Sequence, residues 1–380
     1  MRVLILGAGL MGAVIAKDMV EQAEVESITL VDMDEEKLMK VIRQYPQKIQ
    51  TAKVDVTDTA AAVQVMRGHD VIVSALPHKF SLPAIEAAIE AGVSLVDLVC
   101  CEPEKRLVLD EKAKKAGVAI VPGCGVAPGM SNILAGYGVS HLDSPDKIIV
   151  RVGGFPQNPK PPLGYTIVFC FDSVMEACRE YATVIKNGKI DKLPPLAEVE
   201  RFYFENIGEL ESFITDGLGT LPYTMIKQGV KYAVERTLRY PGYAERMKTL
   251  AVCGLFDETP VDVKGYKIAP KDLTSAVLTP KIRVENDRDI LAMRVTVTGQ
   301  KDGTYVEKNY DLIDYYDEKQ DISAMARTTA FPAAAVARYI ATGVITEKGI
   351  IPPETGIGQN KKIFDMLIKE LTAHNIKISL

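Results

Sequence analysis

The sequence lacks the features that mark several classes of protein. Its 380 residues contain no uncharged apolar run near the ~20 residues of a membrane-spanning helix. Lys and Arg form no cluster and the formal net charge is −5, which argues against binding to a nucleic-acid backbone. With 47% hydrophobic and 25% charged residues, the composition predicts a globular protein without a nucleic-acid or membrane partner.

Residues that bind metals are also scarce. The four histidines stand at no ligand spacing from one another or from a cysteine, so we expect no metal site. No cysteine belongs to a CxxC pair and two of the six are adjacent, which favours reduced thiols in a cytoplasmic protein. The cysteines are Cys100, Cys101, Cys124, Cys170, Cys178 and Cys253.

Short apolar runs alternate with helical patterns over the first third of the chain. Three glycines interrupt the first run and an acidic strand follows, which argues against a signal peptide. Later helices end at a glycine ahead of the next apolar run. This alternation predicts an α/β fold with a parallel, doubly wound sheet over residues 1–123. The predicted strands are 2–6, 27–31, 53–56, 70–77, 93–99 and 118–123.

The pattern changes after residue 123, where alternating segments joined by short turns predict an antiparallel or mixed sheet. We expect a second, mixed-sheet α/β domain over 124–320, and C-terminal helices over 321–380 that pack back on the first domain. The predicted strands are 147–155, 165–171, 198–204, 209–214, 279–286, 291–299 and 304–313, with turns at 285–289 and 299–303. The predicted helices are 172–186, 222–236, 323–342 and 359–374.

The loop after the first predicted strand carries a dinucleotide-binding motif. Gly7, Gly9 and Gly12 have GxGxxG spacing between a strand and a helix. Gly7 permits the tight turn, Gly9 lets a pyrophosphate approach the backbone, and Gly12 lets helix and strand pack closely. The N–H groups of the helix N-terminus, where Leu10 and Met11 lie, face the phosphates. The motif predicts a Rossmann domain over residues 1–123.

An acidic residue at the end of the second strand indicates which dinucleotide is bound. Asp32 would accept hydrogen bonds from the adenosine ribose. Its charge repels a 2′-phosphate and no arginine follows it, so NAD is favoured over NADP. By analogy with the fold, Asp55 would contact the adenine side of the cofactor. The nicotinamide half would lie against Ala75, Leu76 and Pro77.

Six further blocks occur in order along the rest of the chain. They are GVAPGMSNILAG (125–136), VGGFPQNPKPPLGY (152–165), VIKNGKI (184–190), FITDGL (213–218), TLRYPGY (237–243) and GIIPPE (349–354). Together they resemble the saccharopine-dehydrogenase-like family, and within it the L-lysine 6-dehydrogenase branch. Six blocks in register are far more specific than any one of them.

The resemblance implies an NAD-dependent oxidoreductase that acts on a carbon bearing nitrogen. In the lysine branch, the ε-carbon of L-lysine gives up hydride to NAD+, and the imine is hydrolysed to ammonia and allysine, which cyclises. The resemblance also implies a homodimer, in which residues 124–320 carry the substrate face and the dimer contacts. The implied partner is a small-molecule amino-acid substrate.

Site residues follow from the same resemblance. Asp97 ends the fifth predicted strand, where the saccharopine reductases have an acid that touches cofactor and substrate. Arg239 is expected to bind the substrate α-carboxylate bidentately, with Thr237 in the same block and Asp216 in the FITDGL block. The saccharopine enzymes have a further arginine ahead of this loop, whereas residues 216–225 contain no basic residue. A substrate with only one amino-acid end is therefore expected.

Oxidation of an amine also requires a base, because hydride leaves the carbon easily only when the nitrogen is neutral. The ε-amine of lysine has a pKa near 10.4, so the enzyme must remove its proton. The candidates are His78, whose residue type titrates near pH 6.5, and Asp97, followed by Glu102 and Asp216.

These candidates also have structural interpretations. His78 fits a solvent-exposed loop and Asp97 a helix cap or strand end. Asp216 fits a simple turn, and Arg239 an ion pair at the surface or between domains.

Two other functions stay open. A saccharopine or carboxynorspermidine dehydrogenase would work in the reductive direction, although the missing second arginine argues against the saccharopine version. A non-catalytic NAD(H) sensor would keep the glycine loop but would not need the block around Arg239.

Overall fold

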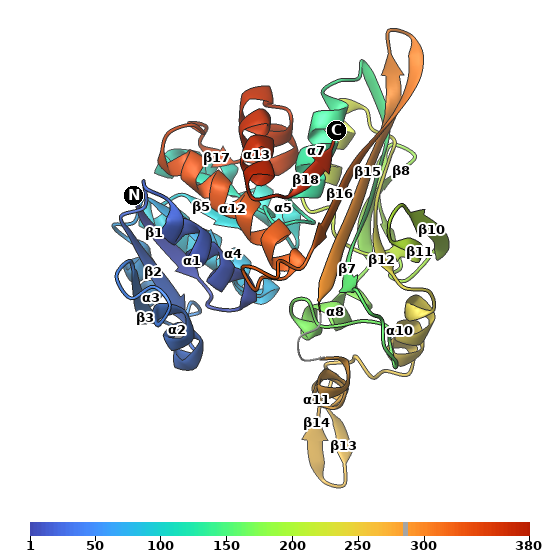
Figure 1. Cartoon of the computed structure of the whole chain (residues 1–380), viewed down its shortest axis with the longest axis horizontal. Helices are drawn as coiled ribbons and strands as arrows, with labels where there is room; N and C mark the ends of the chain where they lie inside the picture. Colours follow the sequence, from blue (N-terminus) through green and yellow to red (C-terminus); the bar gives the residue numbers. More distant parts are fainter. Residues whose placement is uncertain (284–287) are drawn as a thin grey trace. The chain divides into compact units, whose positions relative to one another are not determined.

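The computed structural model describes residues 1–283 and 288–380 (Figure 1). Their contacts divide the chain into two compact units, each built around its own large β-sheet. The first unit contains Met1–Asp143, Gly219–Gln228 and Ala326–Lys377. The second unit contains Ser144–Leu218, Gly229–Met325 and Ile378–Leu380.

A parallel sheet of seven strands forms the centre of the first unit. Its strands are β1 (Arg2–Leu6), β2 (Ser27–Asp32), β3 (Ile49–Lys53), β4 (Val71–Ser74), β5 (Leu95–Asp97), β6 (Ala119–Val121) and β17 (Gly349–Ile350). They are arranged in the order β17-β6-β5-β4-β1-β2-β3. Strands β1, β4, β5 and β6 are completely buried at nearly every position, as expected for apolar runs covered on both faces.

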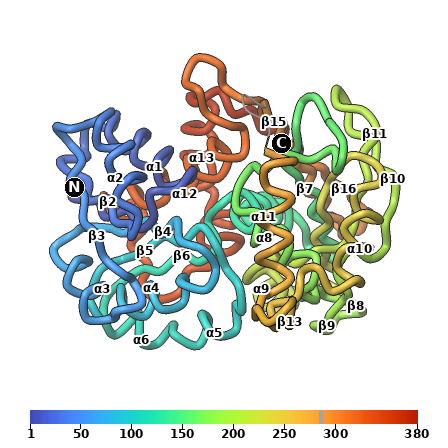
Figure 2. The backbone as a smooth tube through the Cα atoms, turned by 90° about the horizontal axis from the view of Figure 1, so that it is seen from below, coloured from blue at the N-terminus to red at the C-terminus, as the bar shows by residue number. Residues whose placement is uncertain are grey.

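Helices cover this sheet on both faces: Figure 2 shows α3, α4 and α6 on one face and α1 and α12 on the other. Gly92 and Gly117, both in the left-handed conformation, end α4 and α6. The predicted doubly wound α/β fold is therefore confirmed. The helices are α1 (Leu10–Glu21), α2 (Glu35–Ile42), α3 (Thr59–Met66), α4 (His78–Ala91), α5 (Pro103–Leu107), α6 (Asp110–Ala116), α7 (Met130–Val139), α9 (Leu221–Met225), α12 (Ala324–Ala341) and α13 (Lys361–Ala373), with single turns at Ile226–Gln228 and Glu354–Gly358.

The second unit contains the predicted mixed sheet. Its strands are β7 (Ser144–Pro156), β8 (Ala182–Lys186), β9 (Lys189–Leu193), β10 (Glu200–Phe204), β11 (Gly208–Ile214), β12 (Tyr232–Arg239), β15 (Asp289–Lys301), β16 (Thr304–Tyr315) and β18 (Lys377–Ser379). The main order is β10-β11-β12-β7-β15-β16-β18, and β8 joins β12 to β9. Strand β12 runs parallel to β7 and antiparallel to β11, which places it at the change of direction.

Short helices and one hairpin complete the second unit. They are α8 (Phe171–Ala177), α10 (Tyr243–Val252), α11 (Pro270–Ile282) and the pair β13 (Val261–Val263) and β14 (Tyr266–Ile268). The predicted turn at 299–303 is confirmed: Asp302 and Gly303, both with positive φ, join β15 to β16.

Several predicted segments have other structures. The helix predicted at 172–186 is wrong beyond Ala177, because β8 occupies its second half. Residues 165–170 of the strand predicted at 165–171 form an irregular loop, and Phe171 begins α8. The third strand is 49–53 rather than 53–56. At 279–286, helix α11 continues to Ile282, and residues 284–286, with most of the turn predicted at 285–289, lie outside the described residues.

The most consequential error concerns the helix predicted at 222–236. Helix α9 ends at Met225, and β12 begins at Tyr232. Because side chains alternate along a strand, Glu235, Thr237 and Arg239 lie on one side of β12.

Among the described residues, no helix combines the length and hydropathy that crossing a membrane requires.

Candidate active site

The glycine loop of the first unit leaves space for a ligand at one of its three glycines. At Gly7, whose φ is +97°, a Cβ would lie 2.7 Å from the carbonyl oxygen of Ala75. At Gly12, a Cβ would lie 1.8 Å from the carbonyl oxygen of Gly7. At Gly9, no other part of the described chain lies within 4 Å of the Cβ position. Packing thus requires the outer two glycines, and the middle one leaves room for a pyrophosphate.

The N-terminus of α1 and the end of β2 complete this loop. No side chain caps α1 at Gly9, so its first N–H groups stay available for an anion. Leu10 is exposed and Met11 half-buried in the first turn. Asp32 Oδ2 accepts a hydrogen bond from the Ala8 N–H (2.7 Å), which holds the carboxylate beside the loop. These residues fit a dinucleotide, with its pyrophosphate at α1 and a ribose at Asp32.

Asp55 lies in a turn after β3. Its exposed carboxylate accepts hydrogen bonds from the N–H (2.9 Å) and hydroxyl (2.7 Å) of Thr57, and these bonds lower the pKa of Asp55.

Lys53, the register partner of Asp32, pairs with Glu35 at 2.9 Å. This ion pair neutralises a positive charge at the strand end next to Asp32.

The residues predicted on the nicotinamide side follow β4. The N–H of Ala75 donates to the carbonyl of Leu6 (2.8 Å), which keeps this loop against the end of β1. Leu76 is half-buried, and Pro77 precedes α4. His78 is the first residue of α4 and is half-buried. Since β4, β1 and β2 are neighbours in the sheet, these residues gather with the glycine loop at the carboxyl edge of the strands.

Asp97, which ends β5, is completely buried. Ser81 on α4 donates a hydrogen bond to its carboxylate, and Arg106 on α5 donates to Ser81 Oγ (2.7 Å). Burial raises the pKa of Asp97 to about 6, although Ser81 and Arg106 lower it. These contacts suit a residue that positions α4 and α5. Glu102, by contrast, is exposed and forms a surface ion pair with Lys105.

A buried carboxylate also holds the segment 219–228 in the first unit. Glu354 accepts hydrogen bonds from Asn132 Nδ2 (3.0 Å), Thr220 Oγ1 (3.0 Å) and Thr224 Oγ1 (2.6 Å). Burial raises the pKa of Glu354. Two of the six blocks, 125–136 and 349–354, therefore meet at this carboxyl group.

In the second unit, Arg239 is buried at the end of β12 without an acidic partner. Its guanidinium lies 5.1 Å from the ring centre of Tyr165 and 5.5 Å from that of Tyr243. Nη1 donates to the carbonyl of Leu238 (2.7 Å), but Nε has no hydrogen-bond partner among the described residues. No carboxylate of the described chain lies within ion-pair distance of it. A buried guanidinium in this state is suited to binding an anion.

The acid that could have neutralised Arg239 is used elsewhere. Glu211 on β11 is its register partner across the sheet. The Glu211 carboxylate instead accepts hydrogen bonds from the N–H groups of Gly242 (2.8 Å) and Ala244 (2.5 Å), at the start of α10. The N-terminus of α10 thus takes up the charge of Glu211.

Two other predicted residues lie near the same side of β12. Thr237 Oγ1 is 2.7 Å from Thr215 Oγ1, which donates to Glu235 Oε2 at 2.5 Å. Asp216 follows Thr215 and is exposed, and its carboxylate accepts a hydrogen bond from the Thr183 N–H (3.0 Å). Glu235 is not among the predicted site residues, because this segment was predicted as a helix. The period-two pattern of VERTLR was the signal that could have found it.

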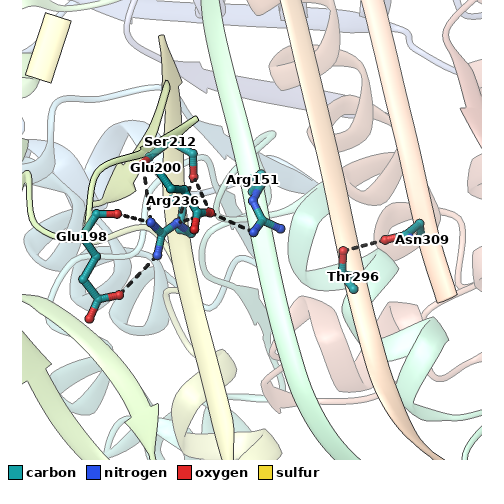
Figure 3. Close-up of polar contacts among 7 residues, drawn as sticks. All are labelled: Arg151, Glu198, Glu200, Ser212, Arg236, Thr296 and Asn309. Atoms are coloured by element: carbon teal, nitrogen blue, oxygen red, sulfur yellow. Dashed lines mark hydrogen bonds and ion pairs between the residues drawn. The ribbon is translucent and has the colours of Figure 1, made fainter. Parts of the chain in front are cut away.

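The opposite side of β12 carries a network in which charges are matched (Figure 3). Arg236 is bonded to Ser212 Oγ (2.9 Å) and paired with Glu200 (3.2 Å) and Glu198 (3.3 Å). Glu200 also pairs with Arg151 on β7 at 2.9 Å. This network ties β7, β10, β11 and β12 together, so we assign it a structural role.

Two other kinds of site, a reactive cysteine and a metal centre, can be checked among the described residues. Burial raises the pKa of the Cys100 thiol, so it is not an activated nucleophile. In residues 1–283 and 288–380, no three His, Cys, Asp or Glu residues gather as metal ligands.

Two family models together match most of the chain. The saccharopine dehydrogenase NADP binding domain matches residues 3–121. The saccharopine dehydrogenase C-terminal domain matches residues 125–376, more than half of the chain.

Individual proteins also match this chain over most of its length. The chain is 24% identical to the saccharopine dehydrogenase (NADP(+), L-glutamate-forming) of Pyricularia oryzae, over 84% of this chain and 85% of that protein. It is 23% identical to the carboxyaminopropylagmatine dehydrogenase of Synechocystis sp., over 93% of this chain and 92% of that protein. The apo structure of the saccharopine dehydrogenase (L-Glu forming) from Saccharomyces cerevisiae has a TM-score of 0.80 at 21% identity, covering 100% of this chain and 99% of that one. This last likeness shows the fold.

Proposed function

Because the chain belongs to the saccharopine dehydrogenase family, we propose that it is an NAD-dependent dehydrogenase that oxidises the ε-carbon of L-lysine. The family consists of amino-acid and polyamine dehydrogenases that act on carbon–nitrogen bonds with NAD(P). The proposal adds the choice of cofactor, the substrate and the direction of the reaction.

The observation that carries the proposal is the state of Arg239. Its guanidinium is buried beside two tyrosine rings, without a carboxylate partner in the described chain. Such a group favours a ligand that brings its own carboxylate, because a bidentate Arg–carboxylate pair restores the missing hydrogen bonds. An α-amino acid is a ligand of this kind.

The lack of a second cation favours lysine over a larger adduct. Residues 216–225, which precede β12, contain no Lys or Arg. A substrate with two amino-acid ends would need a second positive site for its second carboxylate. L-lysine has one carboxylate and, at the other end, the amine that is oxidised.

The reaction converts R–CH2–NH2 and NAD+ with water into R–CHO, ammonia, NADH and a proton. Bound NAD+ supplies the hydride acceptor. The protein must hold the amine neutral and must direct water to the imine carbon. His78, at the start of α4 on the carboxyl edge of the sheet, is our candidate for this proton transfer. Asp97, which is completely buried, positions α4 through Ser81.

The region around Asp32 favours NAD over NADP. Asp32 supplies a negative charge where a 2′-phosphate would lie. Lys53, the basic residue at the neighbouring strand end, is paired with Glu35. Both features weaken the binding of a phosphorylated ribose.

The names of the relatives favour a second candidate function. The relatives in Pyricularia oryzae and Synechocystis sp. are named as saccharopine and carboxyaminopropylagmatine dehydrogenases. A related activity of this chain would join an amine to an aldehyde by reductive amination. Arg239 would then bind the carboxylate of the amine or of the product.

One assay separates these functions: NADH formation from NAD+ with a panel of amino acids and an aldehyde trap. We expect turnover with L-lysine and a trapped cyclic imine, and weaker activity with NADP+. Activity only in reverse, with an amine plus an aldehyde and NADH or NADPH, would replace the first proposal with the second. Tight NADH binding without turnover of any amine would refute both and favour a sensor.

A further inference from the structure

Glu235 is a buried carboxyl group to which the proposed reaction assigns no role. It lies in the middle of β12, is 3% exposed, and has no Lys or Arg of the described chain within ion-pair distance. Its Oε2 packs against Gly217, where a Cβ would lie only 2.9 Å away. The carboxyl group is therefore held between the strand and the turn after β11.

Glu235 is one end of a short hydrogen-bonded chain. Thr215 Oγ1 lies 2.5 Å from Glu235 Oε2 and 2.7 Å from Thr237 Oγ1. Each threonine hydroxyl has one proton to donate and accepts bonds from others. Thr237 is half-buried and lies on the same side of β12 as Arg239, two residues away. The Thr237 end of the chain therefore lies on the side of β12 that carries Arg239.

The protonation of Glu235 sets the direction of every bond in this chain. When Glu235 carries a proton, it donates to Thr215, Thr215 donates to Thr237, and Thr237 has its own proton for a ligand. When Glu235 is ionised, Thr215 must donate to it and Thr237 donates to Thr215. Thr237 then offers a ligand only lone pairs.

We propose that Glu235 is a positioning residue that turns the Thr237 hydroxyl toward the carboxylate bound at Arg239. The proposal rests on the proposed function only in taking a carboxylate as the ligand of Arg239. Protonated Glu235 makes Thr237 a donor that adds a third hydrogen bond to those of the guanidinium. Ionised Glu235 removes that donor.

The surroundings of Glu235 favour the protonated form. The pKa of Glu235 is raised to about 8, mainly by burial and also by the charge of Asp216 in the adjoining turn. The hydroxyls of Thr215 and Thr237 and the guanidinium of Arg239 lower it. Because the ligand prefers protonated Glu235, its affinity is constant at lower pH and falls as the pH rises through this value.

The experiment measures the dissociation constant of L-lysine between pH 6 and 10, with NADH bound, for wild type, Glu235→Gln and Thr215→Val. We expect the wild-type affinity to fall relative to that of Glu235→Gln above about pH 8 and to level off about tenfold lower, as expected for the loss of one hydrogen bond to a charged group. The ratio of the two cancels the titration of lysine itself. A ratio that stays constant over this range would overturn the proposal.

Thr215→Val separates the hydrogen-bonded chain from simple repulsion by the Glu235 charge. This variant keeps Glu235 and removes the hydroxyl that bridges it to Thr237. We expect the fall in affinity around pH 8 to disappear in Thr215→Val. If the fall persists, the effect is electrostatic and the proposed chain is wrong.

A measurement without substrate keeps the proposal separate from the proposed function. NMR of methyl-labelled threonine in the NADH complex should show Thr237 shifting with a midpoint near pH 8 in wild type and not in Glu235→Gln. Such a shift without any binding of lysine would refute the proposed function and support the chain. No shift in wild type would refute the chain.

Discussion

Arg236 and Arg239 lie three residues apart on the same strand and illustrate two uses of a buried arginine. Arg236 contacts Ser212 on β11, Glu200 on β10 and Glu198 just before β10. Arg239, on the opposite side, contacts two tyrosine rings and has no carboxylate of the described chain within ion-pair distance. The fold matches the charge of the first arginine, whereas the second has a charge that a ligand can match.

The difference arises from what the neighbouring strands contribute. On the Arg236 side, β10 supplies Glu200 and the segment before it supplies Glu198. On the Arg239 side, the register partner Glu211 is engaged by the N-terminus of α10. A buried charge without a partner is costly, so its presence indicates a function more strongly than a matched pair does.

The largest effect is expected at Arg239. Replacing it by methionine keeps much of its volume and removes the guanidinium. We expect the dissociation constant of L-lysine to rise about 100-fold, which corresponds to about 3 kcal/mol for a charge-assisted bidentate pair. Isothermal titration of the NADH complex measures it. A change below threefold would place the carboxylate elsewhere.

Arg236→Met is the matched control on the other side of the strand. It removes the cation of Glu198 and one of the two cations of Glu200, and it should lower the free energy of unfolding by about 2 kcal/mol. The affinity for L-lysine should not change. Urea denaturation and titration check the two parts, and a loss of affinity equal to that of Arg239→Met would erase the distinction between the two arginines.

A smaller effect is expected from Glu200→Gln, which removes one charge of the network. Glu200 is 44% exposed, and Arg236 keeps Glu198 and Ser212. The cost in unfolding free energy should therefore stay below about 1 kcal/mol. Urea denaturation measures it, and a cost above that of Arg236→Met would mean that Glu200 has a more important partner.

A separate effect concerns the pH dependence of stability. Because the pKa of Glu235 is raised from 4.5 to about 8 on folding, its contribution is complete below pH 4.5 and decreases as the pH rises to about 8. The stability of wild type should therefore decrease relative to that of Glu235→Gln across this range. Urea titrations at successive pH values test the difference, and parallel curves would show that the pKa of Glu235 does not change on folding.

Much of the first unit could be predicted because its signals are local. The spacing of Gly7, Gly9 and Gly12 and the acid at Asp32 lie within one strand–helix–strand stretch. The second unit depends on contacts between distant strands. Glu235 owes its environment to Thr215 and Gly217 on another segment, and no local pattern reveals that pairing.

Arg239 could be predicted as a site residue, but the surroundings of its charge could not. The sequence block that contains it identified a candidate for binding carboxylate, but not whether another residue would neutralise it. That depends on Glu211, 28 positions earlier, being engaged by the backbone of α10. Asp55 differs from Arg239, because its contacts are local. Its carboxylate bonds Thr57 in the same turn and depends on no distant strand.

The most direct test removes both partners of the proposed carboxylate contact in turn. The affinities of L-lysine and of 1,5-diaminopentane, which is lysine without its carboxyl group, are measured for wild type and Arg239→Met with NADH bound. The account predicts that the variant loses about 100-fold for lysine and almost nothing for the diamine. An equal loss for both ligands would contradict the assignment of Arg239 to the carboxylate.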